Sequence, residues 1–588
     1  MVLFEMVTPD DIPLYPEKVP KHIEYPEIPL FQFLDDAVKD FPENDALVLE
    51  TTSFDKIARV RYAELGDQTD RFASFLVEKG IQQGDKIAVF LPNMVEFVVA
   101  YYGILKAGAT VVSLNFQYPA SELAGQVIQS EARGIVCADM ITASASPYET
   151  CKAVRDEGKI PLEFIVVASV KPYLSKIKGF LGGLMGKISK LDSRDIYMKD
   201  IFEKYNPKGR PKVTIKPDDV AVIMFTGGTT GTPKGAMLTN RNLVSNVIQC
   251  SVWMDPAPER GTVIGIGSLP FFHSYGATTS MNLGIFFGGL MVLMLDPREN
   301  RFSQILYLLE KYKVQIFNTV PTLYMALLNH PDLKKYDLSF LLTSTSGAAP
   351  LPVSVLQEFE AISGANLAEG YGLTETSPVS HIIPMSPAPG TDTPLKKDGS
   401  VGIPVPDTES IILDIETGTK QLGIDMEGEI AISGPQVMKG YYKRPEETAE
   451  VMRDIDGKRY FLTGDIGKYD SDFYFYITDR KKDLINVGGF KAYPREIEEV
   501  LIEHPKISNA ACIGVSHPSV GETVKLYIVP KPNSDLTKEE ILEYSRRKLV
   551  KYKQPYDERY IEIRSQLPLS DIGKVLRRVL KDEERSRE

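Results

Sequence analysis

A glycine-rich stretch in the middle of the chain carries residue types that can hold a polyphosphate. It reads Thr226-Gly-Gly-Thr-Thr-Gly-Thr-Pro-Lys-Gly235 and follows the apolar run 220–225, which predicts a buried strand. Glycines let a ligand approach the backbone, while N–H groups, hydroxyls and the Lys234 ammonium attract phosphate oxygens. Apolar residues at helical spacing then predict a helix capped by Thr239 or Asn240. We therefore expect a phosphate loop between a strand and a helix, although it lacks the spacing of a Walker loop and a plain surface loop fits the same letters.

Four stretches downstream combine carboxylates, hydroxyls and lysines with glycine. They are Tyr371-Gly-Leu-Thr-Glu375, Thr463-Gly-Asp465, Asp479-Arg-Lys-Lys-Asp-Leu-Ile-Asn-Val-Gly-Gly489 and Leu567-Pro-Leu-Ser-Asp-Ile-Gly-Lys574. Each of them alone is compatible with a turn, an ion pair or a surface lysine. Taken with the glycine-rich stretch, the five motifs resemble, in kind and in order, those of the adenylate-forming enzymes, which include acyl-CoA synthetases, luciferases and peptide-synthetase adenylation domains. The resemblance covers nearly the whole chain.

The resemblance implies a two-step reaction. A carboxylate is a poor acyl donor because its leaving group would be oxide, so the family first joins the acid to AMP and releases pyrophosphate. The enzyme must hold ATP, bring a carboxylate oxygen to the α-phosphorus and stabilise charge on the phosphoryl oxygens. A thiol then displaces AMP. The implied cofactors and substrates are ATP, Mg²⁺ and CoA.

The resemblance also assigns an ATP site. Lys234 is expected at the β and γ phosphates and Thr374 at the α-phosphate, while Glu375 and Thr226 are expected at Mg²⁺, which prefers few carboxylates plus phosphate oxygens. Asp465 is expected at the ribose hydroxyls. The full expected ATP- and AMP-binding set is Thr226, Gly227, Gly228, Thr229, Thr230, Gly231, Lys234, Gly347, Ala348, Glu369, Gly370, Tyr371, Gly372, Asp465 and Arg480.

The implied catalytic residues are Lys574, Thr374 and Glu375. By resemblance, Lys574 contacts the acyl carboxylate and the α-phosphate during adenylation, so we expect it to act on rate more than on binding. Lys482 occupies the hinge about which the family rotates its small domain between the two steps. Gly488 and Gly489 are expected to line the pantetheine tunnel, with an ordinary tight turn as the alternative.

The identity of the acid depends on two further stretches. His273, Ser274 and Tyr275 resemble the family's gate beside the acyl carboxylate, although a satisfied core histidine is the plain alternative. The stretch 489–498 resembles the fatty-acyl-CoA synthetase version of the hinge region. We therefore predict an ATP-dependent ligase that joins medium- to long-chain fatty acids to CoA. The alternatives are a 4-coumarate-like ligase for aryl acids and a non-catalytic sensor that binds acyl-adenylate or CoA.

The order of expected elements predicts an α/β protein with more than one domain, as its 588 residues require. Residues 1–479 are expected to form a large AMP-binding domain of doubly wound α/β subdomains, with a small β-rich subdomain at about 400–478. Residues 480–588 are expected to form a small, mobile α+β domain that carries the catalytic lysine.

The amino-acid composition limits the expected binding partners and the expected cellular compartment. A net charge of −12 argues against nucleic-acid binding, and four scattered cysteines favour a reducing cytoplasm. The uncharged run 275–295 is long enough for a membrane span, but its glycines and polar residues favour a buried helix, a turn and a core strand. We expect fatty acid, ATP and CoA as partners, and a homodimer is left open.

Residues 171–190 depart from the α/β pattern. Apolar residues gather on one face of a helical projection and glycines on the other, with five lysines and no acidic residue. One interpretation is a helix packed on the protein. The other is an interfacial helix that makes a peripheral contact with the inner face of the membrane.

Overall fold

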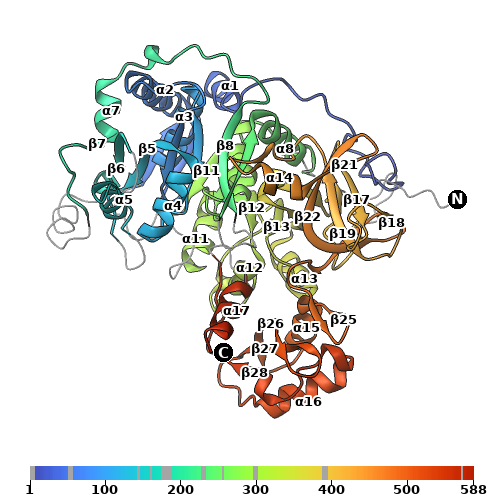
Figure 1. Ribbon diagram of the computed structural model, residues 1–588. Helices are drawn as coiled ribbons and strands as arrows, with labels where there is room; N and C mark the ends of the chain where they lie inside the picture. The colour runs from blue at the N-terminus through green and yellow to red at the C-terminus, as the bar shows by residue number, and fades with distance from the viewer. Residues whose placement is uncertain are drawn as a thin grey trace. The chain divides into compact units, whose positions relative to one another are not determined.

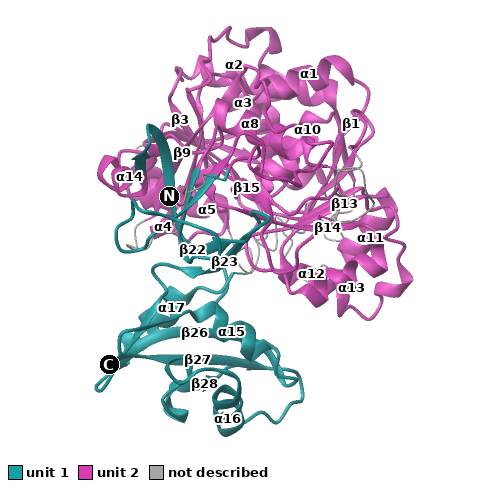
Figure 2. Cartoon of the chain, turned by 90° about the vertical axis from the view of Figure 1, so that its right-hand side faces the viewer, with its two compact units in different colours: residues 1–7, 410–432, 453–588 teal, residues 8–409, 433–452 magenta. Residues whose placement is uncertain are grey.

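A computed structural model describes residues 7–50, 57–141, 146–158, 162–173, 188–226, 233–254, 257–295, 302–386, 395–570 and 574–587. The chain divides into two compact units, which are described separately below (Figure 2). Unit 2 contains residues 8–409 and 433–452, and unit 1 contains residues 1–7, 410–432 and 453–588. Thus segments from the expected β-rich region group with the C-terminal part of the chain. The expected boundary at 479/480 stays a prediction.

One sheet of unit 2 is doubly wound. Among the described residues it has eight strands in the order β20-β9-β8-β4-β3-β5-β6-β7, so the chain builds outward from β3 in both directions. Figure 1 labels β5, β6, β7 and β8 of this sheet. The strands are β3 (Lys86–Phe90), β4 (Thr110–Ser113), β5 (Ala132–Ala138), β6 (Phe164–Ala168), β7 (Ile196–Tyr197), β8 (Val220–Thr226), β9 (Lys234–Thr239) and β20 (Gly440–Tyr441). The helices are α2 (Tyr62–Glu78), α3 (Val95–Lys106), α4 (Ala120–Ser130), α5 (Pro147–Asp156), α7 (Met198–Lys204), α8 (Asn240–Val252) and α14 (Pro445–Val451).

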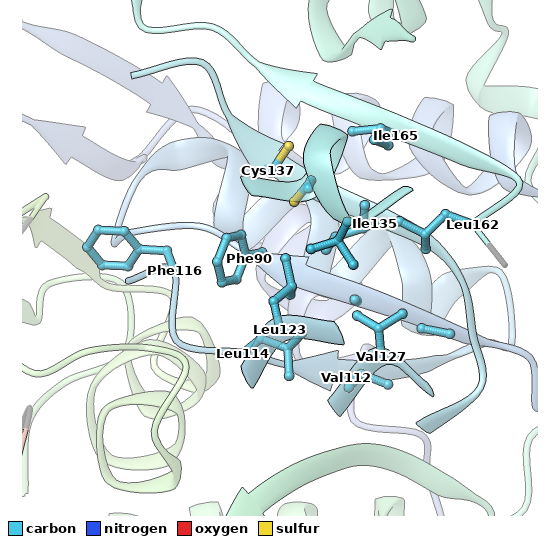
Figure 3. Close-up of a cluster of buried hydrophobic side chains, with 14 of the residues drawn as sticks. Phe90, Val112, Leu114, Phe116, Leu123, Val127, Ile135, Cys137, Leu162 and Ile165 are labelled. Carbon is cyan, nitrogen blue, oxygen red and sulfur yellow. The ribbon is translucent and has the colours of Figure 1, made fainter. Parts of the chain in front are cut away.

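Apolar side chains cover both faces of this sheet. Figure 3 shows one face, where Leu123 and Val127 of α4 pack against Phe90 and Ile135, and Cys137 and Cys151 are buried in the same cluster. Ile165 of β6 belongs to the same cluster. The preceding residue, Phe164, points to the opposite face of the sheet, where its ring lies 5.6 Å from the ring of Phe75 in α2. Strands buried on both faces read as continuous apolar runs, which is why the sequence revealed them.

The second sheet of unit 2 has nine strands among the described residues, in the order β16-β15-β14-β13-β12-β10-β11-β1-β2. They are β1 (Asp45–Leu49), β2 (Ala58–Arg61), β10 (Ile264–Gly267), β11 (Leu290–Leu293), β12 (Ile316–Thr319), β13 (Thr343–Ser346), β14 (Asn366–Gly372), β15 (Val379–Ile382) and β16 (Ile403–Pro404). Its accompanying helices are α1 (Gln32–Asp40), α9 (Ser274–Gly276), α10 (Leu283–Phe286), α11 (Phe302–Tyr312), α12 (Pro321–Leu328) and α13 (Val353–Ser363).

Unit 1 holds two smaller sheets. The first contains β17 (Glu409–Leu413), β18 (Gln421–Leu422), β19 (Gly428–Ser433), β21 (Met452–Ile455), β22 (Lys458–Tyr469) and β23 (Phe475–Arg480). The second contains β24 (Ile485–Val487), β25 (Phe490–Ala492), β26 (Ile507–His517), β27 (Gly521–Pro530) and β28 (Ile561–Ile563), with α15 (Pro494–Ile502), α16 (Lys538–Lys548) and α17 (Arg577–Arg585). This is the expected α/β architecture followed by α+β, so the predicted fold class is confirmed.

The run 275–295 is a core element. Short helical segments from Ser274 to Phe286 lead through a turn at Gly288 into β11, and most of these side chains are buried. No helix in the described ranges has both the length and the apolar character needed to span a membrane. The prediction of a buried helix, a turn and a strand is therefore confirmed.

The expectation that the glycine-rich loop leads directly into a helix is wrong. Lys234–Thr239 forms strand β9, which pairs antiparallel with β8 from Thr226↔Lys234 to Val220↔Thr239. Gly235 allows this pairing, since a Cβ there would lie 2.8 Å from a methyl group of Ile223. The helix begins only after β9, where Thr239 is its N-cap as expected and accepts from the Asn242 amide.

Candidate active site

The two ends of the glycine-rich loop are held by a strand pair. Thr226 ends β8 and Lys234 begins β9, and the Thr226 hydroxyl lies 3.4 Å from the carbonyl oxygen of Lys234. The expected phosphate ligands Gly227, Gly228, Thr229, Thr230 and Gly231 lie outside the described residues. The described ends of the loop, Thr226 and Lys234, are therefore fixed next to each other by the pairing of β8 with β9.

Glu375 lies in a short 3₁₀ segment after β14. Its carboxylate is buried and accepts a 2.8 Å hydrogen bond from the hydroxyl of Tyr441. The Tyr441 ring in turn lies below the Lys234 ammonium, 5.3 Å from its centroid. The structure thus brings together the expected metal ligand and the expected phosphate lysine.

Thr374, in the stretch 371–375, lies close to the expected acyl gate at His273, Ser274 and Tyr275. The hydroxyl of Ser274 lies 3.4 Å from the hydroxyl of Thr374. His273 is half-buried, and its Nδ1 accepts from the Tyr275 amide at 3.2 Å. The Tyr275 hydroxyl donates to the carbonyl oxygen of Thr345 at 3.0 Å. His273 and Tyr275 are therefore held by local bonds, and Ser274 faces the expected α-phosphate residue.

Backbone shape explains several glycines of the expected adenine site. A Cβ at Gly347 would come within 3.1 Å of the Tyr275 ring, and Ala348 has a φ of 68°, which is uncommon for a residue with a side chain. A Cβ at Gly372 would collide with the carbonyl of Pro378 at 1.8 Å. Tight packing against Tyr275 and Pro378 therefore leaves no room for a side chain at Gly347 or Gly372, which follow β13 and end β14. Glu369, Gly370 and Tyr371 lie beside them in β14.

A buried histidine that the sequence did not single out supports Tyr371. His381 of β15 pairs with Tyr371 across the sheet, with ring centroids 5.7 Å apart. Burial lowers the pKa of His381 to about 3, so the imidazole is neutral at physiological pH. His381 thus serves as an uncharged support for the ring that is expected to face adenine.

In unit 1, Asp465 and Arg480 stand opposite each other on β22 and β23. Their side chains form an ion pair of 3.3 Å, and the Asp465 carboxylate is buried. Glu429 braces the neighbouring turn, because it accepts from the Gly464 amide at 3.1 Å and from the Lys481 ammonium at 2.8 Å. An oriented carboxylate of this kind suits a sugar diol.

Lys574 belongs to the same group of charges. Its amide donates to the Ser570 hydroxyl at 3.0 Å, and the Ser570 amide donates to its carbonyl oxygen at 2.7 Å. Burial and the positive charge of Arg480 lower the pKa of Lys574 to about 7, and Asp465 opposes this shift. Burial likewise lowers the pKa of Lys482. Unit 1 therefore gathers the expected ribose ligand, hinge lysine and catalytic lysine.

Arg577 fastens the helix that follows Lys574. Its guanidinium contacts the buried Glu498 carboxylate at 2.5 and 3.1 Å and lies 3.4 Å from Asp483 in the expected hinge stretch. Burial raises the pKa of Glu498 to about 7, although Arg577 opposes the shift. Arg577 thus joins α17, α15 and the turn after β23, and this residue was not identified from the sequence.

We predict that Arg577→Met destabilises the protein in a pH-dependent way. Without its partner the buried Glu498 carboxylate is uncompensated, at a cost of about 3 kcal/mol. The folded-state pKa of Glu498 then rises further above its unfolded value, so the penalty is full above the folded pKa and fades as pH falls. Thermal unfolding is expected to show a larger loss at about pH 8 than at about pH 5.5. The control is Arg578→Met, because Arg578 is exposed; equal losses at both pH values would contradict the assignment.

Gly488 and Gly489 form the turn of the β24–β25 hairpin. Both have positive φ values, 59° and 88°, and a Cβ on either would meet no atom within 4 Å. A two-residue hairpin turn of this type requires such angles, so the turn alone explains both glycines. A role toward pantetheine stays a prediction.

The donor set around Glu375 suits Mg²⁺. The described residues contain no group of three or more His, Cys, Asp or Glu side chains that could enclose a metal. Mg²⁺ commonly takes one or two carboxylates and completes its shell with water and substrate phosphates. The Glu375 carboxylate and the Thr226 hydroxyl are donors of this kind, and their joint binding of one ion stays a prediction. When bound, the ion would offset negative charge on the phosphates.

Comparison with protein families places the chain in a class. The AMP-binding enzyme model matches residues 34–442, and the model of the AMP-binding enzyme C-terminal domain matches residues 496–574. The chain therefore belongs to the AMP-binding enzyme family, which confirms the resemblance to adenylate-forming enzymes.

Individual relatives are similar over nearly the full length. A long-chain-fatty-acid–CoA ligase of Bacillus subtilis (strain 168) is 38% identical over 583 residues, 97% of each chain. A probable 4-coumarate–CoA ligase 2 of Dictyostelium discoideum is 35% identical over 523 residues, 88% of this chain and 89% of its own. The crystal structure of ATP-bound MatB from Rhodopseudomonas palustris aligns with a TM-score of 0.76 at 28% identity, covering 95% of this chain and 99% of that one.

Proposed function

We propose that the protein is an ATP-dependent, AMP-forming ligase that joins medium- to long-chain fatty acids to CoA. Its substrates are a fatty acid, ATP and CoA, and its metal is Mg²⁺. Family membership and the similarity to a long-chain-fatty-acid–CoA ligase support this proposal. The observation that carries it is the 3.4 Å distance between the hydroxyls of Ser274 and Thr374, which supports a shared site for the two, because Ser274 is proposed for the acyl group and Thr374 for the α-phosphate. That is where a carboxylate oxygen must attack.

Each residue has a proposed role in this reaction. Lys234 and the loop Gly227–Gly231 hold the β and γ phosphates, and Thr374 orients the α-phosphate. Backbone from Gly347 to Ala348 and from Glu369 to Gly372 frames adenine, while Asp465 and Arg480 hold the ribose. The proposed acyl-binding residues are His273, Ser274 and Tyr275, with Lys482 as hinge and Gly488–Gly489 beside pantetheine. The positive charge of Lys574 stabilises the negative charge on the carboxylate and the α-phosphoryl oxygens as they react.

The second candidate is a ligase for aryl acids of the 4-coumarate type, which the Dictyostelium relative favours. ATP–pyrophosphate exchange with a panel of fatty and aryl acids tests both candidates. We expect medium- and long-chain fatty acids to support the fastest exchange. Preference for 4-coumarate would select the second candidate. Absence of exchange with every acid would support a non-catalytic binder and reject both.

We further propose a cytoplasmic enzyme that touches the membrane peripherally through residues 171–190. Residues 174–187 lie outside the described residues, but both ends of the segment are described. Asp139 holds both ends: its carboxylate accepts from the Val170 amide at 2.9 Å, and its carbonyl oxygen accepts from the Ser189 amide at 2.9 Å. The described residues on either side of the segment are therefore both bonded to Asp139.

We expect the wild type to float with anionic vesicles and Leu181→Asp/Leu184→Asp to remain in the soluble fraction. The sequence offers five lysines, each contributing about 1 kcal/mol near an anionic surface, and an apolar face to insert. Ile424→Asp/Met426→Asp is the matched control, because these two apolar side chains are exposed elsewhere. Equal flotation of wild type and the 181/184 variant would contradict membrane docking. Lost thermal stability in that variant would instead place the segment in the core.

For the oligomeric state we propose a homodimer as the alternative to a monomer. Sedimentation velocity of the purified enzyme distinguishes the two.

A further inference from the structure

A short segment of unit 2 runs alongside the strand that begins with Lys234. Residues 440–441 form β20, which pairs antiparallel with β9 through Gly440↔Met237 and Tyr441↔Ala236. Further backbone bonds flank this pair, from the Tyr442 amide to the carbonyl of Gly235 at 2.8 Å and from the Lys439 amide to that of Met237 at 3.0 Å. The position of Tyr441 is therefore fixed relative to the outgoing strand of the glycine-rich loop.

The same segment is bonded to Glu375, the last residue of the stretch 371–375. The Met438 amide donates to the backbone carbonyl of Glu375 at 2.8 Å, and the Tyr441 hydroxyl donates to the Glu375 carboxylate at 2.8 Å. The Tyr441 side chain is buried, and its hydroxyl therefore orients one oxygen of the Glu375 carboxylate.

The Tyr441 ring has a second contact. The Lys234 ammonium lies 5.3 Å from the ring centroid, within the range of a cation–π attraction. Lys234 and Tyr441 are both buried, which strengthens such an attraction. A single side chain therefore touches two charged groups, one through its hydroxyl and one through its ring.

We propose that Tyr441 is a positioning residue that sets the Glu375 carboxylate for Mg²⁺ and the Lys234 ammonium for the β and γ phosphates. The inference rests on the proposed function and adds a residue that none of the five motifs contains. The hydroxyl acts on the metal through Glu375, and the ring acts on the phosphates through Lys234. The two actions are separable, because Phe keeps the ring and removes the hydroxyl, while Leu removes both.

Tyr442 supplies a matched control. Its hydroxyl donates to Glu131 at 2.8 Å, and its ring lies 5.0 Å below the Lys86 ammonium. It therefore makes the same two kinds of contact with groups outside the proposed site. Tyr442→Phe and Tyr442→Leu remove equivalent groups one residue away.

The test uses the full-length enzyme and two readouts. Mn²⁺ binding in the presence of α,β-methylene-ATP is measured by electron paramagnetic resonance, and the Mg²⁺ dependence and ATP KM are measured in pyrophosphate exchange. For Tyr441→Phe we expect Mn²⁺ affinity to fall roughly tenfold and half-saturating Mg²⁺ to rise to match. The ATP KM at saturating Mg²⁺ is expected to stay within about twofold, because the ring remains. For Tyr441→Leu the KM is expected to rise by a further factor of about three to ten.

Three outcomes overturn the proposal. The first is unchanged Mn²⁺ affinity and Mg²⁺ dependence in Tyr441→Phe. The second is the same shift in Tyr442→Phe. The third is a loss of thermal stability in Tyr441→Phe with unchanged Mn²⁺ affinity per folded molecule, which would make the tyrosine structural. A wild type that binds Mn²⁺ and the ATP analogue but shows no exchange with any acid would reject the proposed function, and the Mn²⁺ readout would still decide the role of Tyr441.

Discussion

Lys574→Ala is expected to lower the rate of adenylation by about two to three orders of magnitude and to leave thioester formation from pre-made acyl-adenylate close to the wild-type rate. The reason is that Lys574 is proposed to meet charge that develops while bonds to the α-phosphorus form and break. In the second step the thiol attacks the carbonyl carbon and AMP leaves, so no bond to phosphorus changes. An interaction made mainly in the transition state changes kcat more than substrate binding.

The electrostatics of unit 1 sharpen this expectation. Burial and Arg480 lower the pKa of Lys574 to about 7, so a lysine without bound anions is only partly charged near neutral pH. A carboxylate and a phosphate brought beside it favour the protonated form and raise that pKa. Substrate binding thus favours the protonated Lys574 ammonium, which is the form that stabilises the transition state.

The two half-reactions are measured separately. Adenylation is measured by pyrophosphate exchange. Thioester formation is measured by mixing synthetic acyl-adenylate with CoA. Lys538→Ala is the control, because this lysine is exposed at the start of α16 in the same unit. Equal losses in both half-reactions of Lys574→Ala would reject the assignment, and so would an equal effect of Lys538→Ala.

Sequence patterns predicted those parts of the fold in which local residues decide the structure. The apolar runs of β3 and β4 and the spacing of α3 match the observed Lys86–Phe90, Thr110–Ser113 and Val95–Lys106, because buried parallel strands and their helices have distinct periods. Strand β9 was missed, since Lys234–Thr239 is short, holds a glycine and is defined by its pairing with β8 rather than by its own letters.

The residues of the candidate site also fall into those that local sequence predicts and those that only distant contacts reveal. Glu375, Asp465 and Lys574 lie in motifs with recognisable spacing, so they could be selected from the chain alone. Tyr441 and Arg577 lie outside those motifs, and their importance comes from contacts with Glu375 and Glu498, which are 66 and 79 positions away. No local pattern marks a tyrosine that faces a distant carboxylate. A glycine followed by two tyrosines was the only signal, and it did not say which ring faces the site.

Lys482→Pro is expected to have the opposite effect to Lys574→Ala, lowering CoA thioester formation by about a hundredfold or more while pyrophosphate exchange stays within about tenfold of wild type. Proline fixes its own φ and restricts the residue before it, so rotation about this position is hindered. The turn here is closed by the Asp483 amide, which donates to the carbonyl of Arg480 at 2.9 Å, and proline at 482 does not remove that bond.

Lys482→Ala is the matched control for this prediction, because it removes the same side chain and leaves the backbone free to rotate. The alanine variant is therefore expected to keep the rates of both half-reactions within a few-fold of wild type. A loss found only in the proline variant then reports on backbone rotation and not on the ammonium group. Both variants are compared in pyrophosphate exchange and in thioester formation from acyl-adenylate. Unchanged thioester rates in Lys482→Pro would reject the hinge, and an equal loss in Lys482→Ala would assign the effect to the lysine side chain beside Asp465 and Arg480.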